Sequence, residues 1–115
     1  MVSQPFSAVL SDGREGVTVV SFSGDIDLTA EPEVRRALAD ATGADAPRAV
    51  VDLSRVSFMD STGFNLLIDA HLRATARNGW VRVATLPPVV QHVFRALSLD
   101  EVISAYPTLG EALAA

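Results

Sequence analysis

The sequence contains no cysteine and no lysine, and it has only 2 histidines, His71 and His92. The absence of cysteine excludes disulfides, zinc sites built on thiolates and a thiol nucleophile. The two histidines are far apart in the chain and give no metal-ligand spacing. The sequence therefore predicts no metal centre, and we expect no cofactor.

Long hydrophobic runs are also missing. The uninterrupted apolar runs are only a few residues long, whereas a membrane-spanning helix needs roughly 20 apolar residues. The start of the chain, Met1 to Pro5, has no cationic segment followed by an apolar one, so no secretory signal is predicted. We expect a cytoplasmic protein that does not insert into membranes.

Clustered positive charge is a third absence. The chain has 14 acidic and 9 basic residues, a formal net charge of -5, and the pair Arg35 and Arg36 is the only local basic cluster. Nucleic acids and anionic lipids are bound by clustered basic side chains. The charge distribution therefore argues against nucleic acid as a partner.

The residues that are present predict one compact domain over residues 1–115, because 115 residues with 49% hydrophobic side chains suffice for a single core. Two β-branched and aromatic runs, 6–11 and 17–23, are separated by a turn with two glycines and predict a hairpin. A polar segment follows at 24–27. Residues 49–53 read as a strand that is apolar on both faces, which is typical of a central, parallel strand.

Helical spacing of apolar residues appears between these strands. Thr29 and Pro32 are start signals for a first helix, and Asn78-Gly79 is typical of a left-handed helix end. We expect further strands at 80–84 and 102–106 and a terminal helix at 108–115. The alternation predicts an α/β fold: a mixed sheet of about five strands with right-handed crossovers and about four helices. The apolar stripes of the second and third helices are Phe64, Leu67, Ile68, His71 and Leu72, and Val90, Val93, Phe94 and Leu97.

The junction Asp60-Ser61-Thr62-Gly63 lies between an apolar strand and an amphipathic helix. Backbone N–H groups at a helix start lack intrahelical partners and carry partial positive charge, so they stabilise an anionic group. Ser61 is therefore a candidate phosphoacceptor, with Thr62 as a secondary one. The alternative roles are structural: Ser61 as a helix N-cap worth about 1 kcal/mol, and Thr62 as a first-turn residue.

The segment from Phe58 to Gly63, with the strand before it and the helix after it, closely resembles the phosphorylation-site motif of bacterial anti-sigma factor antagonists, which are single STAS domains. Residues 23–27 look like the Gly-acid-apolar-Asp element of that family, and 83–97 resemble its strand, short loop and helix. The resemblance covers about 6–113, which we take as the domain core.

This resemblance implies that Ser61 is phosphorylated by a partner kinase that is itself the anti-sigma factor. Asp60 matches the acidic residue before the serine, and Asp25 or Asp27 matches an acidic loop near it; equally, Asp25 and Asp27 could simply form turns. Asn65 stands where many family members have a second glycine, which leaves the identity of the partner open. The implied partner-binding residues are Asp25, Asp27, Asp60, Thr62, Gly63, Phe64 and Asn65.

By the same resemblance, the unphosphorylated form binds an ATP-binding anti-sigma factor serine kinase and frees a sigma factor. Phosphorylation of Ser61 switches binding off, a phosphatase resets it, and the chain is a monomer or weak dimer. The alternative is a STAS scaffold subunit of a stress-sensing or lipid-transport ATPase complex.

A serine hydrolase is the third function class that we considered. Ser61 is not in a Gly-x-Ser-x-Gly elbow, and neither histidine stands in a triad context. We expect His71 to be a packed, hydrogen-bonded side chain. The chain is therefore not predicted to be an enzyme.

Overall fold

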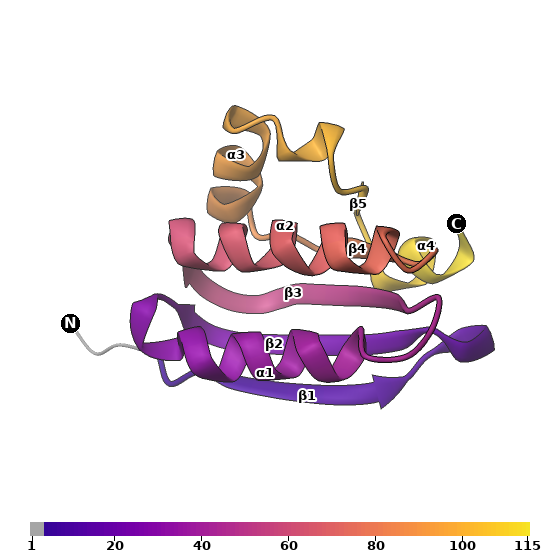
Figure 1. Cartoon of the computed structure of the whole chain (residues 1–115). Coiled ribbons are helices and arrows are strands. Elements are labelled where there is room, and N and C mark those ends of the chain that lie inside the picture. The colour runs from indigo at the N-terminus through magenta and orange to yellow at the C-terminus, as the bar shows by residue number, and fades with distance from the viewer. Residues whose placement is uncertain (1–3) are drawn as a thin grey trace.

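A computed structural model describes residues 4–115 (Figure 1). The expectation of no secretory signal concerns in part residues 1–3, which lie outside the described residues. The strands are β1 (Ser7–Asp12), β2 (Thr18–Ile26), β3 (Arg48–Met59), β4 (Trp80–Ala84) and β5 (Ala105–Tyr106). The α-helices are α1 (Glu31–Ala41), α2 (Ser61–Thr75), α3 (Pro88–Ala96) and α4 (Leu109–Ala114), and short 3-10 turns are η1 (Arg14–Gly16), η2 (Leu28–Ala30) and η3 (Leu99–Glu101).

The five strands form one sheet in the order β1-β2-β3-β4-β5. β1 and β2 form the predicted antiparallel hairpin, and the pairs β2–β3, β3–β4 and β4–β5 are parallel. β3 lies in the middle, and its residues Ala49, Val50 and Val51 are each 0% exposed. The predicted α/β fold, a mixed sheet of five strands with four α-helices, is confirmed for residues 4–115.

Helices cover both faces of the sheet. Figure 1 shows α1 and α2 lying side by side across one face, where residues such as Leu38 and Leu67 pack with Val51 in the main core. Val50 alternates with Val51 along β3 and therefore points to the opposite face. There it packs with Ala112 of α4 in a second, smaller cluster. The two clusters explain why 49–53 carries apolar residues on both faces, with Asp52 as the one charged residue of the segment.

Three predicted strand boundaries were wrong. The segment 24–27 was expected to be a polar loop, but Gly24 to Ile26 belong to β2, which continues past a register shift beside Gly24. Gly24 has φ 88°, a conformation that glycine adopts without steric cost, so the strand can kink and continue. β3 is longer than 49–53 and runs to Met59, whereas β5 has only two residues, because η3 forms just before it.

The predicted helix stripes were partly wrong as well. Leu72 is 55% exposed and Leu97 is 54% exposed, so neither belongs to the core. In α2 the predicted Phe64 and Leu67 are buried, and the buried side also includes Leu66, Ala70 and Ala74. The predicted left-handed helix end is present at Asn78, which has φ 66°, and the N–H of Gly79 donates to the Ala74 carbonyl over 2.8 Å.

Candidate functional site

The junction between β3 and α2 consists of one residue, Asp60. Its carboxylate accepts a hydrogen bond from the Thr62 N–H over 2.9 Å, and its carbonyl accepts one from the Gly63 N–H over 3.1 Å. Its own N–H donates to the Ile26 carbonyl over 3.1 Å. Asp60 therefore caps α2 and also ties the helix start to the end of β2. The N-cap role considered for Ser61 belongs to Asp60 instead, because Ser61 already has helical conformation.

Ser61 is the first residue of α2 and is exposed. Its hydroxyl takes part in none of the side-chain hydrogen bonds found among residues 4–115. Because Asp60 caps the helix, the Ser61 hydroxyl is not needed as the cap. An exposed hydroxyl at the positive end of a helix is accessible to a modifying enzyme, and the helix dipole favours a negative group there.

Gly63 allows the first turn of α2 to lie directly on the sheet. A Cβ atom at this position would be 2.6 Å from Met59 Cγ and 2.8 Å from Ile26 Cγ2, closer than atoms normally approach. The next residue, Phe64, is 2% exposed. Both residues are buried, so in this structure they position the helix start, while Ser61 and Asn65 are the exposed residues of the turn.

Asp25 and Asp27 lie at the end of β2, next to the end of β3. The Asp25 carboxylate accepts a hydrogen bond from the Gln4 N–H over 3.1 Å. The Asp27 carboxylate accepts from the Thr29 N–H over 2.9 Å and from the Thr29 hydroxyl over 2.5 Å. The Thr29 hydroxyl is the main cause of a lowered Asp27 pKa.

These contacts fit the turn-forming role that we considered for the two aspartates. No hydrogen bond joins either of them to Ser61 among residues 4–115. Their nearness to the serine comes from the sheet, because Asp25 pairs with Phe58 and Ile26 pairs with Met59 in the β2–β3 ladder.

Two exposed apolar side chains accompany these acidic groups. Leu28 of η2 is 73% exposed, and Phe58 near the end of β3 is 48% exposed. Sequence reasoning noted Phe58 as part of a motif but missed Leu28. An apolar residue directly after the Asp27 cap, outside any periodic stripe, was the signal that could have indicated it.

His71 has a structural contact, and the described residues 4–115 contain no metal-binding cluster. The His71 ring accepts a hydrogen bond at Nδ1 from the Val81 N–H over 3.3 Å, which fits the packed, hydrogen-bonded role expected of it. Residues 4–115 contain no group of three or more His, Cys, Asp or Glu side chains that could hold a metal ion.

No helix in residues 4–115 has the length and apolar character needed to span a membrane.

A family model described as the STAS domain matches residues 8–112. The anti-sigma-F factor antagonist RsfB of Mycobacterium tuberculosis is 28% identical over 100 residues, which cover 87% of this chain and 81% of RsfB. The crystal structure of an anti-sigma factor antagonist from Mycobacterium paratuberculosis is 31% identical and superposes with a TM-score of 0.87, covering 98% of this chain and 97% of that one. Phosphorylated SpoIIAA of Bacillus has the same fold, with a TM-score of 0.72, 24% identity and coverage of 94% and 97%.

Proposed function

The chain belongs to the STAS domain family, and from that premise we propose that it is an anti-sigma factor antagonist controlled at Ser61. The observation that carries the proposal is the exposed Ser61 hydroxyl at the first residue of α2, beside a cap that Asp60 already provides. The names of two mycobacterial relatives, each an anti-sigma factor antagonist, support the same function.

In this proposal the unphosphorylated chain binds an anti-sigma factor through the surface around Ser61. Leu28 and Phe58 supply exposed apolar area, and Thr62 and Asn65 lie beside the serine on the first turns of α2. A partner that covers this surface removes both apolar side chains from water, which favours association. The bound anti-sigma factor then releases its sigma factor.

Phosphorylation of Ser61 would reverse this binding. A phosphate adds a charge of about -1.5 to -2 at neutral pH. The new charge would lie next to Asp60, at the end of the sheet that also carries Asp25 and Asp27. A partner shaped for a neutral hydroxyl would have to desolvate the phosphate without compensation, so affinity falls.

The proposed partner is an anti-sigma factor that is also a serine kinase and binds the ATP itself. The chain then needs no cofactor and performs no catalysis, and a separate phosphatase removes the phosphate. We place this exchange in the cytoplasm, where ATP and sigma factors are found. The surfaces of both partners select the individual kinase and phosphatase, because pairing specificity depends on them.

The test is a binding measurement with each ATP-binding anti-sigma serine kinase encoded in the same genome, produced separately. Wild type and Ser61→Ala should bind one of them equally, and Ser61→Asp should bind at least about tenfold more weakly, a loss of about 1.4 kcal/mol. Ser11→Asp is the matched control, because it adds the same charge to an exposed serine at the opposite end of the sheet. It should bind like wild type.

Incubation with ATP should also place phosphate on wild type but not on Ser61→Ala, as mass spectrometry would detect. Equal affinity of Ser61→Asp and wild type would contradict the proposal. Phosphopeptide mapping of the protein from growing and stressed cells gives an independent check. Ser61 unmodified in both conditions, together with a constitutive large assembly, would favour the scaffold role instead.

A further inference from the structure

A hollow that Ser61 does not line is found between α3, η3 and the ends of β4 and β5. Its volume is about 640 Å³, and its lining includes Leu86, Gln91, Phe94, Arg95, Asp100 and Ala105. This volume falls within the range of small-molecule sites, roughly 300–1,000 Å³. The hollow lies where two parallel strands end, and ligands of open α/β sheets bind outside the carboxyl ends of strands.

The backbone at the edge of this hollow is strained. Thr85 directly follows β4 and has φ 56°, in the left-handed region. A β-branched residue rarely adopts this conformation, which costs roughly 1–2 kcal/mol. The hydrogen bond from the Thr85 N–H to the Tyr106 carbonyl, 3.0 Å long, holds the residue in place. Residues with strained backbone cluster at active sites and ligand clamps, and Thr85 lies at the edge of this hollow.

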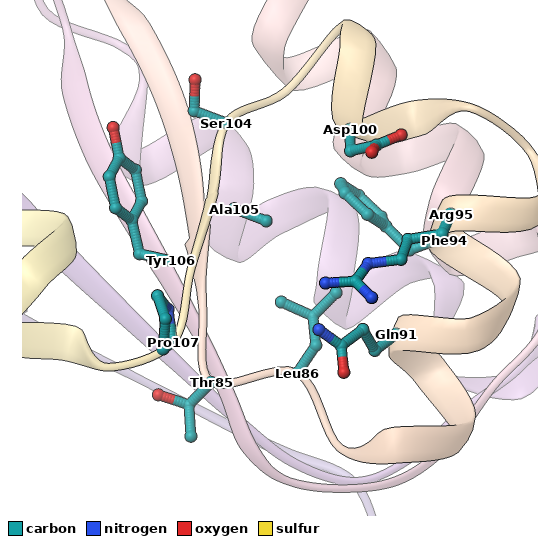
Figure 2. Close-up of a pocket in the computed structure, with 10 residues that line it drawn as sticks. All are labelled: Thr85, Leu86, Gln91, Phe94, Arg95, Asp100, Ser104, Ala105, Tyr106 and Pro107. Atoms are coloured by element: carbon teal, nitrogen blue, oxygen red, sulfur yellow. The ribbon is translucent and has the colours of Figure 1, made fainter.

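Two side-chain hydrogen-bond donors of α3 face this hollow, and a backbone donor of a third lining residue lies at the sheet edge beside it. Figure 2 shows the guanidinium of Arg95 and the amide of Gln91 extending from α3 toward Leu86 and Ala105, whereas the Tyr106 hydroxyl points away. Arg95 belongs to none of the three ion pairs found among residues 4–115.

The third donor is the backbone N–H of Ala105. The carbonyls of Ser104 and Tyr106 accept hydrogen bonds from the N–H groups of Val83 and Thr85 and therefore point toward β4. Because backbone groups alternate along a strand, the N–H of Ala105 points to the outer edge of the sheet. β5 is the last strand of that sheet, so within residues 4–115 no strand pairs with this edge.

We propose that this hollow binds a small organic carboxylate with an apolar body. The carboxylate is held by Arg95, Gln91 and the Ala105 N–H, and the apolar body lies on Leu86 and Phe94. Asp100 lines the same hollow, so a ligand with a single negative charge fits better than a phosphate carrying two. The ring of Phe94 lies 6.5 Å from that of Phe64 in the first turn of α2, which places this site next to the start of that helix.

The test uses the full chain alone, with phenylacetate as the probe and phenylacetamide as its uncharged counterpart. In a ¹⁵N–¹H NMR titration, phenylacetate should give saturable shifts of the Leu86, Gln91 and Ala105 amides, and phenylacetamide should bind at least about tenfold more weakly. Arg95→Gln should weaken phenylacetate binding by a similar factor, as expected for loss of a charge-assisted hydrogen bond. Asp100→Asn should tighten it. Arg36→Gln, at an exposed arginine of α1, is the control and should leave the affinity unchanged.

Several outcomes would overturn the inference. These are no saturable shift with phenylacetate, equal binding of acid and amide, equal loss in Arg95→Gln and Arg36→Gln, or binding of inorganic phosphate at least as tight as that of phenylacetate. The titration needs no anti-sigma partner, so its result is independent of the function proposed for Ser61.

Discussion

Two junctions in this molecule have the same place in the topology and are built differently. Both lead from the carboxyl end of a parallel strand into a helix. Between β3 and α2 there is only Asp60, whose side chain caps the helix. Between β4 and α3 there are three residues, from Thr85 to Pro87, with a left-handed Thr85 and a helix start that has no side-chain cap.

The difference shows how linker chemistry decides what a strand end can do. At the first junction, capping by Asp60 and close packing at Gly63 bring the helix against the sheet, so that only surface groups such as Ser61 remain available. At the second, a three-residue linker leads into α3, and a hollow remains between α3 and β5. Pro88 at the first helical position has no N–H to satisfy, which suits a helix start without a cap. The first junction exposes a serine at a helix start, and the second borders an open hollow.

The largest expected effect comes from disrupting the junction between β3 and α2. Gly63→Val should lower the free energy of unfolding by about 2–3 kcal/mol, because its side chain would overlap Met59 and the tightly packed Ile26. Urea unfolding measures this as a lower midpoint. Gly110→Val in α4 is the matched control, since the nearest atom to a Cβ there is 3.9 Å away. Equal midpoints for the two variants would mean that Gly63 does not set the position of α2.

A smaller change in the free energy of unfolding, with the opposite sign, is expected at the junction between β4 and α3. Thr85→Gly should raise the free energy of unfolding by about 0.5–1 kcal/mol, because relief of left-handed strain exceeds the entropy cost of glycine. Thr62→Gly makes the same change in the first turn of α2, where the backbone is already helical, and should lower stability by a few tenths of a kcal/mol. Thermal unfolding of both variants shows whether each substitution raises or lowers the stability. A destabilised Thr85→Gly would show that the strain at this φ is smaller than the entropy cost of glycine.

The sequence allowed the first junction to be predicted but not the second. Segment 49–53 has apolar residues on both faces because β3 is buried on both faces there, and this strand followed by an amphipathic helix indicated the Asp60-Ser61 turn between them. The rest of β3 was missed because its pairing with β4 ends at Asp52, beyond which exposed residues such as Ser54 and Ser57 break the apolar run.

At the second junction the residue type gave the wrong expectation. Threonine disfavours positive φ, so nothing in Thr85-Leu86-Pro87 indicated a left-handed residue, and its conformation depends on the tertiary hydrogen bond to Tyr106. Leu97 fitted the helical period of α3 but lies just past its end and is exposed. Periodicity gives the direction of a side chain but not whether another element covers it.

The smallest effect concerns a third junction, where Asp27 caps η2 after β2. Asp27 has a pKa below its usual 3.8, chiefly because the Thr29 hydroxyl donates to its carboxylate. A carboxyl group whose pKa is lowered by folding stabilises the fold above its unfolded pKa and loses that contribution as the pH falls through the folded pKa. Thr29→Val removes the hydroxyl but keeps the backbone donor, so the Asp27 pKa should rise only part of the way toward 3.8. NMR titration of the Asp27 carboxyl carbon measures it directly. Thr18→Val, at the other end of β2, should leave the Asp27 midpoint unchanged, and an unchanged midpoint in Thr29→Val would show that the hydroxyl contact does not control this carboxylate.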